Sequence, residues 1–321
     1  MIEATGLQKR YGDQLAVASV DVEVPAGTVL GVLGPNGAGK STTVRILTTM
    51  TLPDAGRASV GGFDVVTQAA EVRRIIGVTG QDASLDEQLT GTQNLTMVGQ
   101  LSRMTKRDAQ ARTVELLEQF ELTFAAERMV KTYSGGMRRR LDLAASLIAR
   151  PPVLFLDEPT TGLDPTSRQG VWDVIRRLVR DGTTVMLTTQ YLDEADALAD
   201  RISVIDHGMV IAEGTSEDLK AKVGGEQLEV RLVEPHSNAV NALAPLVSGP
   251  VQVADGGRRL TAPVTIRPGL ATAFIRALDD AGVEVDDFQI HHPSLDDVFF
   301  TLTGHGAEAP VTDADAELVE V

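Results

Sequence analysis

The chain contains no cysteine, only 4% aromatic residues and no long hydrophobic run. Without cysteine it can form no disulfide, thiol nucleophile or cysteine-ligated metal site, which fits a reducing cytosol. No stretch approaches the roughly 18 apolar residues of a membrane-spanning helix, and the N-terminal residues lack the basic and apolar regions of a secretory signal. We therefore expect a chain that does not cross a membrane by itself.

Positive charge is also scarce, because 29 Lys and Arg stand against 45 Asp and Glu, a net charge of −16. Binding to nucleic-acid phosphates needs a basic face that displaces counterions. The charge balance therefore argues against a DNA or RNA partner. The acidity is concentrated in residues 225–321, which hold 5 basic and 16 acidic residues.

What remains is a globular composition, with 43% hydrophobic and 23% charged residues, and a length that suggests about two domains. Residues 1–223 alternate short apolar runs, closed by glycine-rich turns, with helical patterns, which predicts an α/β domain on a mostly parallel sheet. Buried strands are predicted at residues 28–33, 153–156 and 184–188. A helical insert is predicted at about 82–150, with a surface helix at 105–120.

A second, smaller α+β domain is predicted at residues 226–304, after a linker at Gly224-Gly225. Its expected order is β-α-β-β-α-β, that of a split βαβ or ferredoxin-like fold, followed by a last helix. Residues 305–321 hold five acids and no Lys or Arg, and we expect them to be disordered. The strands are predicted at 228–233, 251–254, 259–267 and 283–290, and the helices at 238–247, 269–281 and 294–303.

Residues 34–41, GPNGAGKS, match the phosphate-loop pattern G-x-x-x-x-G-K-[ST] directly between a predicted strand and a helix. The glycines let backbone N–H groups point inward, and the helix N-terminus adds positive potential. Lys40 supplies a full charge to the β- and γ-phosphates, and the Ser41 hydroxyl can reach Mg²⁺. The nucleotide-binding residues predicted here are Gly34, Asn36, Gly37, Gly39, Lys40, Ser41 and Thr42.

A second apolar strand, ending at residue 156, runs into two adjacent carboxylates, Asp157 and Glu158. Asp157 is expected to hold the Mg²⁺ shell, and Glu158 to orient and polarise the attacking water. A strand that runs into acidic loop residues is commonplace by itself. Together with the phosphate loop it predicts an NTP-hydrolysing site.

Between these two motifs stands Tyr133-Ser134-Gly135-Gly136-Met137-Arg138, followed by a helical run. The segment resembles the signature motif of ABC transporter ATPases. Ser134 is expected to cap a helix, and Gly135 and Gly136 to allow close approach, which makes a second anion-binding helix N-terminus. The resemblance implies a head-to-tail homodimer, in which the signature of one subunit closes on the ATP held by the other.

Further segments resemble this family in the same order over residues 1–223. The resemblance implies that Tyr11 stacks on adenine and that Asp164 reaches across the dimer. It also implies that Gln81 links Mg²⁺ to the membrane subunit, which would contact the helical insert. There are two departures: Met137 replaces a common glutamine, and Gln190 replaces the usual histidine that contacts the γ-phosphate.

Three segments, YSGGMRRR, TTQYLDEAD and SLDDVFFTLTG, resemble more narrowly the daunorubicin/doxorubicin-resistance ATP-binding subunits of actinobacterial drug exporters. This resemblance implies that residues 226–304 form the accessory domain of that subfamily. We expect Glu158 and Gln190 to be the catalytic residues of an ATPase that uses ATP and Mg²⁺, because the Gln190 amide can donate to the γ-phosphate from a reach similar to that of histidine. The chain would lie at the cytoplasmic face of the cell membrane, bound to a separately encoded membrane permease.

The sequence leaves the exported compound open. An anthracycline-like drug follows from the resemblance alone, and a lipid or another natural product would leave the same ATPase. A soluble ABC ATPase acting on ribosomes or DNA is disfavoured by the single core and the acidic balance. A catalytically weak regulatory or drug-binding module is disfavoured by the intact Lys40, Asp157 and Glu158.

Overall fold

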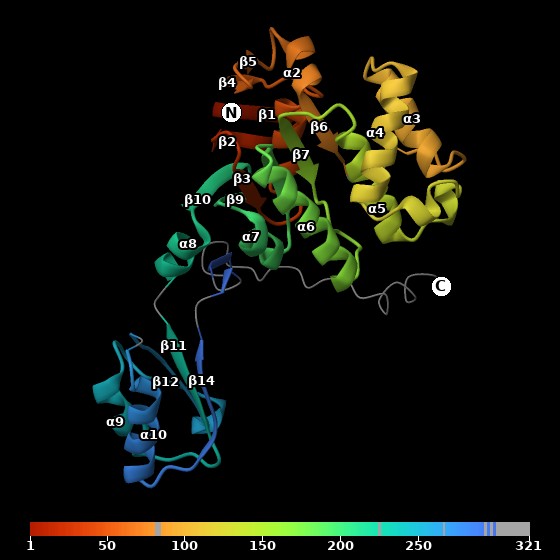
Figure 1. Ribbon diagram of the computed structural model, residues 1–321. Helices are drawn as coiled ribbons and strands as arrows, with labels where there is room; N and C mark the ends of the chain where they lie inside the picture. Colours follow the sequence, from red (N-terminus) through yellow and green to blue (C-terminus); the bar gives the residue numbers. More distant parts are fainter. Residues whose placement is uncertain (81–84, 224–225, 266, 292–293, 296–297, 300–321) are drawn as a thin grey trace, which may run out of the picture. The chain divides into compact units, whose positions relative to one another are not determined.

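The computed structural model describes residues 1–80, 85–223, 226–265, 267–291, 294–295 and 298–299 (Figure 1). The chain forms two compact units, the first containing Met1–Ser216 and the second beginning at Glu217. The predicted linker at residues 224–225 lies outside the described residues. Within the described part of the chain, no helix is long and apolar enough to cross a membrane.

The first unit is built on a ten-stranded sheet with the order β5-β4-β1-β2-β10-β9-β3-β8-β7-β6. The five strands from β9 to β6 run parallel to one another, as expected of an α/β domain. Their bounds are β9 Arg201–Asp206, β3 Val29–Leu33, β8 Thr184–Thr189, β7 Val153–Asp157 and β6 Ile76–Thr79. The other strands are β1 Ile2–Tyr11, β2 Gln14–Val24, β4 Ala55–Val60, β5 Phe63–Asp64 and β10 Met209–Gly214.

Both faces of the parallel strands are covered, which explains why their sequences are apolar without alternation. Along β7, Leu154 and Leu156 belong to one hydrophobic cluster, together with residues of the helices α5 and α6. Val153 and Phe155 belong to the other cluster, together with residues of α1. The helices are α1 Lys40–Leu47, α5 Gly135–Ser146 and α6 Pro165–Arg180.

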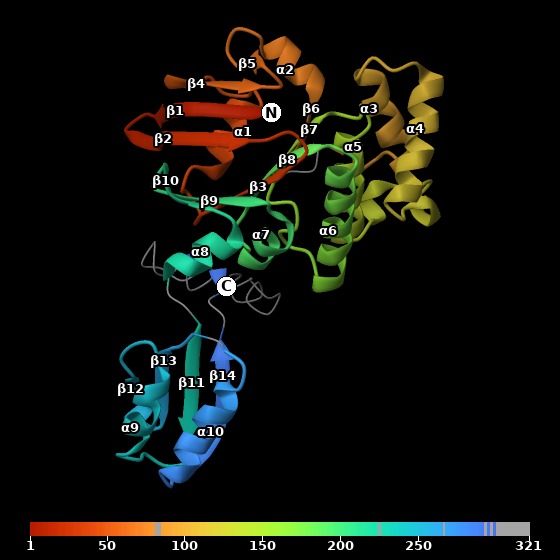
Figure 2. The same ribbon diagram turned by 60° about the vertical axis from the view of Figure 1, so that its left-hand side comes forward.

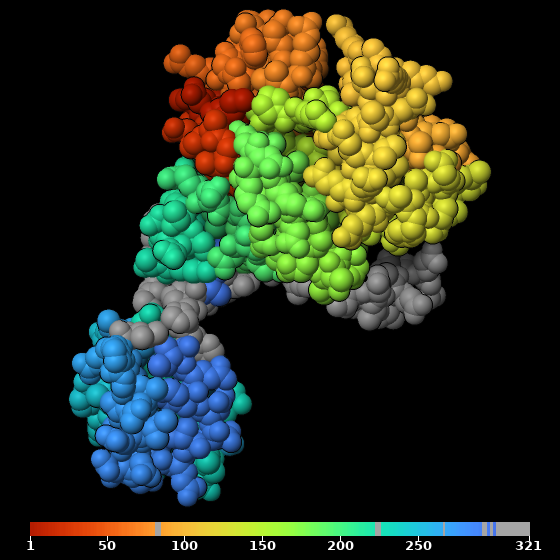
Figure 3. Space-filling model, viewed as in Figure 1, coloured from red at the N-terminus to blue at the C-terminus, as the bar shows by residue number. Residues whose placement is uncertain are grey.

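A helical region lies to one side of the parallel strands, where α3 and α4 stand beside α5 (Figure 2). Figure 3 shows its side chains as a separate mass next to those of α6. The predicted surface helix at 105–120 is confirmed as α4. This helix begins after Thr105, whose hydroxyl caps it by accepting a hydrogen bond from the Asp108 N–H at 3.2 Å. Among the described residues up to 223, the other helices are α2 Ala69–Ile75, α3 Gly91–Leu101, α4 Lys106–Gln119, α7 Leu192–Leu198 and α8 Ser216–Val223, with short 3₁₀ turns η1 Thr123–Ala125 and η2 Val130–Thr132.

The second unit has a four-stranded antiparallel sheet with the order β12-β13-β11-β14. Along the chain its elements follow the expected order β-α-β-β-α-β, and this strand order is that of a split βαβ. The core holds side chains of both helices and of the inner sheet face, with Phe274 fully buried. The elements are β11 Gln227–Leu232, α9 Ala239–Leu243, η3 Ala244–Leu246, β12 Gln252–Ala254, η4 Asp255–Gly257, β13 Arg259–Pro263, α10 Leu270–Asp280 and β14 Val285–His291.

Two predicted elements of this unit are wrong in length. The helix expected over 238–247 ends at Leu243, because Pro245 has no N–H to donate and its ring clashes with the carbonyl one turn earlier. The strand expected over 259–267 ends at Pro263, where proline has no N–H for the ladder. Most of the predicted last helix and the whole predicted tail at 305–321 lie outside the described residues.

Candidate nucleotide-binding site

The carboxyl ends of three neighbouring parallel strands bring the predicted motifs to one edge of the sheet. Strand β8 lies between β3 and β7, with Leu33 opposite Thr189 and Asp157 opposite Thr188. The phosphate loop follows β3, the two carboxylates end β7, and Gln190 follows β8. The fold therefore gathers residues that lie far apart in the sequence.

The phosphate loop is glycine-rich because the backbone passes too close to its neighbours for a side chain. A Cβ on Gly34 would lie 2.2 Å from the Ile205 carbonyl oxygen, and one on Gly39 would lie 2.5 Å from that of Ala16. Gly39 also adopts φ 106° as the N-cap of α1, so no side chain covers the N-terminus of this helix. The arrangement leaves a cradle suited to an anion.

The Lys40 side chain is buried and lies against the phosphate loop. It is only 4% exposed, and its Nζ donates hydrogen bonds to the carbonyl oxygens of Gly34 at 2.7 Å and Pro35 at 3.1 Å. The same Nζ lies 3.9 Å from Glu158 Oε1. One cation therefore joins the phosphate loop to the carboxylate predicted to polarise water.

The residues predicted to hold Mg²⁺ fit that ion in their chemistry. Ser41 Oγ donates to Asp157 Oδ1 at 3.1 Å, and Thr188 Oγ1 donates to the same oxygen at 2.5 Å. Hydroxyl and carboxylate oxygens suit Mg²⁺, which usually takes one or two carboxylates together with substrate phosphates. The described residues contain no cluster of three or more His, Cys, Asp or Glu that could hold a metal through protein ligands alone. Gln81, the third predicted ligand, lies outside the described residues.

Glu158 has a left-handed backbone conformation, with φ 50°, which is uncommon for a residue with a side chain. Its N–H donates to the Thr188 carbonyl at 3.1 Å, and its Oε2 accepts from the Thr161 hydroxyl at 3.2 Å. Such backbone strain persists only where the surroundings hold it, and it is concentrated at functional sites. The carboxylate is thus fixed beside Lys40.

Arg139 is a site residue that the sequence analysis missed. Its buried guanidinium donates to the carbonyl oxygens of Gly80 at 2.7 Å, Asp157 at 3.0 Å, Glu158 at 2.8 Å and Pro159 at 2.7 Å. Burial lowers the pKa of Arg139 from its usual value. The only signal in the sequence was a run of three arginines on one helix, which does not show which of them reaches the carbonyl oxygens around Asp157 and Glu158.

A cavity of about 290 Å³ adjoins the phosphate loop. Tyr11, at the end of β1, lies at this cavity and is 47% exposed. Lys9 Nζ lies 5.6 Å from the centre of the Tyr11 ring, and the half-exposed ring lies beside the loop, as stacking on a base requires. The cavity is lined by Tyr11, Gln14, Ala16, Asn36, Gly37, Ala38, Gly39, Lys40, Ser41, Thr42 and Glu158.

The predicted signature segment begins α5 as expected, because the Ser134 hydroxyl accepts the Met137 N–H at 3.3 Å. Gly135 is exposed, and a Cβ at this position would meet no other part of the chain within 4 Å. Gly136, in contrast, lies close to another part of the same chain, because a Cβ there would lie 2.7 Å from Ser167 Oγ on α6. The signature and the start of α6 therefore lie side by side.

Asp164 caps α6 by accepting the Ser167 N–H at 3.0 Å and the Ser167 hydroxyl at 2.5 Å. These hydrogen bonds lower the pKa of the Asp164 carboxyl. A second cavity, of about 370 Å³, connects the loop before α6 to the signature. Glu158 lines this cavity as well as the one at the phosphate loop, so it stands between the two motifs.

Gln190, at the end of β8, is half-buried, and its side-chain Oε1 is buried without a hydrogen-bond partner in the described part of the chain. A hydrogen bond from the Tyr191 N–H to Thr189 Oγ1, at 2.9 Å, spans the residue. The backbone at Gln190 is therefore held by its neighbours, and the side-chain oxygen keeps hydrogen-bonding capacity for another group.

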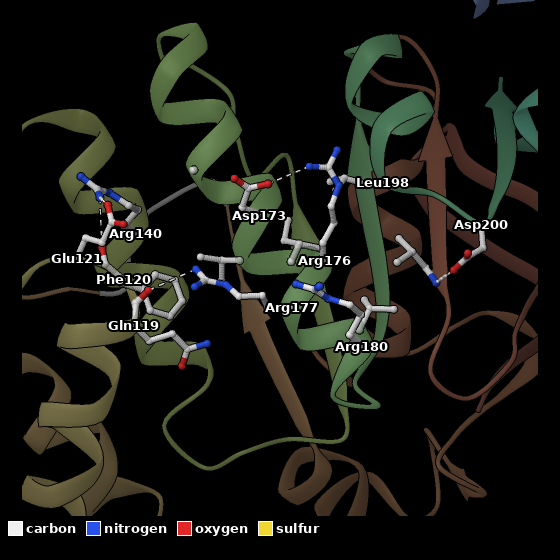
Figure 4. A pocket seen from close by; sticks show the side chains of 15 residues that line it. Gln119, Phe120, Glu121, Arg140, Asp173, Arg176, Arg177, Arg180, Leu198 and Asp200 are labelled. Atoms are coloured by element: carbon white, nitrogen blue, oxygen red, sulfur yellow. Dashed lines mark hydrogen bonds and ion pairs between the residues drawn. The ribbon is translucent and has the colours of Figure 1, made fainter.

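A larger cavity, of about 690 Å³, lies beside α6 and contains none of the predicted motif residues (Figure 4). Its charged side chains are largely engaged with one another: Arg176 Nη1 lies 3.0 Å from Asp173 Oδ1, and Arg140 Nη1 lies 3.7 Å from Glu121 Oε2. The residues predicted to bind phosphate line the smaller cavity instead.

Comparison with known proteins agrees with this geometry. Residues 17–161 match the ABC transporter family. Over 304 residues the chain is 56% identical to the daunorubicin resistance ATP-binding protein DrrA3 of Streptomyces coeruleorubidus, covering 94% of this chain and 96% of that protein. The chain belongs to the ABC transporter ATP-binding proteins.

Other members of the family extend the likeness. The daunorubicin/doxorubicin resistance ATP-binding protein DrrA of Streptomyces peucetius is 51% identical over 317 residues, covering 98% of this chain and 96% of that protein. Among solved structures, the dimeric structure of a bacterial ABC transporter cassette is 26% identical, with a TM-score of 0.62, covering 67% of this chain and 98% of that one. The ABC ATPase core predicted from the sequence is thus confirmed.

Proposed function

We propose that the chain is the ATP-hydrolysing subunit of an exporter that moves a hydrophobic, anthracycline-like drug or antibiotic through a separate membrane permease. The observation that carries this proposal is the assembly of Lys40, Ser41, Asp157 and Glu158 at one sheet edge. It occurs in a chain that shares 51–56% identity, over almost its full length, with daunorubicin resistance ATP-binding proteins.

Each residue of this assembly has a distinct part in the reaction. The amides at the start of α1 and the Lys40 ammonium bind the β- and γ-phosphates, and Tyr11 stacks on the adenine. Ser41 and Asp157 hold Mg²⁺, which when bound neutralises charge on the phosphates. The Glu158 carboxylate accepts a hydrogen bond from the attacking water and orients it toward the γ-phosphate.

Hydrolysis on this proposal takes place in a homodimer. The N-terminus of α5, with Ser134 and Gly135 at the surface, supplies hydroxyl and amide donors to the ATP held by the second copy. Asp164 contacts that second copy, and Gln190 donates its amide to the γ-phosphate of its own ATP. The dimer works at the cytoplasmic face of the cell membrane against the permease, and involves no nucleic acid.

The identity of the cargo rests on the relatives alone, so a lipid or another natural product is the second candidate for the exported compound. A purely regulatory module is disfavoured by the buried contacts of Lys40, which keep its charge facing both the phosphate loop and Glu158. A protein without turnover has no need for that arrangement.

The substitution Glu158→Gln tests this proposal. The amide keeps the size of the side chain but polarises water poorly, so we expect hydrolysis to fall by at least about 100-fold while ATP binding survives. Light scattering should then detect an ATP-dependent dimer, and the parent chain with its permease should show ATPase activity that rises with an anthracycline substrate.

The matched control is Glu23→Gln, the same chemical change on the exposed face of β2. It should leave turnover at the parental level. Full hydrolysis by Glu158→Gln would contradict the assigned site, and the absence of an ATP-dependent dimer would contradict the homodimer.

A further inference from the structure

Helix α6 holds the segment that follows Gln190. Arg168, one turn after the capping residue Asp164, places its guanidinium carbon 4.5 Å from the centre of the Tyr191 ring. Its Nη1 also lies 3.0 Å from Asp193 Oδ2. The Arg168 side chain is only 15% exposed, so both interactions are partly shielded from water.

A second contact from the same face of α6 lies one turn further along. Trp172 Nε1 donates to Glu194 Oε1 at 3.1 Å, and Glu194 is fully buried. Residues 168 and 172 are four apart and therefore project from one side of the helix. Three of the four residues after Gln190 are thus tied to α6.

These contacts reach Gln190 through the backbone. Gln190 is followed directly by Tyr191, whose N–H is bound to Thr189 Oγ1 across it. The backbone next to Gln190 is therefore held by this hydrogen bond and by the contact of the Tyr191 ring with Arg168. Arg168 lies in the first turn of α6, directly after the capping residue Asp164, whose loop the proposed function places against the second copy.

We infer that Arg168 is a positioning residue that fixes Gln190 relative to Asp164, so that the dimer-facing loop and the γ-phosphate contact move together. The Arg168 N–H donates to the Asp164 carbonyl at 2.9 Å, so the first turn of α6 joins the two residues directly. This inference rests on the proposed roles of Gln190 and Asp164.

Arginine is suited to this task because its planar guanidinium can stack on a ring and pair with a carboxylate at the same time. Lysine at position 168 would keep the charge for Asp193 but lose the planar stacking surface. The two contacts can therefore be separated by Arg168→Lys and by Asp193→Asn.

The test is a double-mutant cycle on the full chain, with steady-state ATP hydrolysis measured over a range of ATP concentrations. We expect Arg168→Gln to lower kcat by about threefold to tenfold, because it removes the stacking and the ion pair that hold Tyr191. KM for ATP should stay within about twofold, because Lys40 and Tyr11 are untouched. In a Gln190→Ala background, Arg168→Gln should have no further effect.

Arg176→Gln is the matched control, since Arg176 lies on the same helix, pairs with Asp173 at 3.0 Å and donates to the Ala197 carbonyl at 3.3 Å. It should leave kcat unchanged. Should Arg168→Gln fail to fold, Arg168→Lys and Asp193→Asn should each show the same dependence on Gln190.

Two results overturn the inference alone: a parental kcat in Arg168→Gln, or an equal loss of kcat from this change with and without Gln190. A parental kcat in Gln190→Ala overturns the proposed role of Gln190 and the inference with it. Loss of ATP hydrolysis in the parent chain would be a failure of the proposed function itself.

Discussion

The two helix N-termini expected to meet phosphate, those of α1 and α5, are built differently. At α1, glycine leaves the helix end without a side-chain cap, and the buried Lys40 faces the loop. At α5, Ser134 caps the helix and Gly135 is exposed. One end is thus enclosed by its own chain, and the other is presented to solvent.

The charges near the two ends differ in the same way. The arginines of α5 are engaged within the chain: Arg138 pairs with Glu87 at 3.1 Å, and Arg139 donates to backbone carbonyls. The α5 end therefore offers hydroxyl and amide donors, without a lysine aimed at a ligand as at α1. From this difference we expect that α1 binds ATP in a single chain, whereas α5 adds weaker contacts to phosphates that another copy already holds.

The substitution Lys40→Ala tests the phosphate site at the N-terminus of α1 and has the largest expected effect. It removes the full charge that the loop directs at the β- and γ-phosphates, so we expect ATP binding to weaken by at least about 100-fold and turnover to vanish. Calorimetry with MgATP measures the first and phosphate release the second. Lys106→Ala, on exposed α4, is the control, and unchanged affinity in Lys40→Ala would disprove the phosphate site.

The substitution Gly135→Asp tests the N-terminus of α5, where weaker phosphate contacts are expected. The position has open space and the start of a helix tolerates a carboxylate, so the chain should fold. The new charge repels phosphate, and we expect turnover to fall by at least about 100-fold while a single chain binds ATP normally. Gly170→Asp on α6, also in open space, is the control. A loss of ATP binding by Gly135→Asp would show that α5 serves its own nucleotide.

Much of this contrast could be predicted from the sequence, because the residues that produce it lie close together along the chain. The phosphate loop is a contiguous pattern between a strand and a helix, and the Ser134 cap depends on residues three positions apart. The central strands were found because burial on both faces makes them continuously apolar.

The rest depended on the fold or on a signal that was overlooked. Arg139 donates to carbonyls up to 59 residues away, and carbonyl acceptors leave no mark on the sequence. The close approach of Gly136 to Ser167 likewise arises only when α5 meets α6. The end of α9 is a different case, since Pro245 was visible and should have stopped the predicted helix.

Substitutions of Gln190 test the contact with the γ-phosphate of the ATP that is expected at the N-terminus of α1. Its amide can donate to the γ-phosphate but stays neutral, whereas a protonated histidine brings charge, and charge-assisted hydrogen bonds are roughly twice as strong. We expect Gln190→Ala to lower kcat by about tenfold and Gln190→His to retain or raise it. Hydrolysis is measured with the permease present, and a parental rate in Gln190→Ala would contradict the role.

The smallest expected effect concerns Glu194, whose carboxyl joins α7 to α6 through its hydrogen bond with Trp172. Burial raises the pKa of this carboxyl above its ordinary value of 4.5, although the hydrogen bond from Trp172 opposes the shift. An acid with a raised pKa in the folded state contributes stability that is fully present below the unfolded value. That contribution is lost as pH rises through the folded value.

Glu194→Gln should remove this pH dependence, since the amide accepts the Trp172 hydrogen bond and never ionises. We therefore expect the Tm of the unit containing Met1–Ser216, in the variant relative to the parent, to rise by about 2–4 °C between pH 5 and pH 8, as a change of about 1 kcal/mol gives for a domain of this size. The exposed Glu118→Gln should show a Tm difference that does not vary with pH. A constant difference for Glu194→Gln as well would mean that burial of Glu194 does not alter its ionisation, and that the Trp172 contact works equally well with a charged carboxylate.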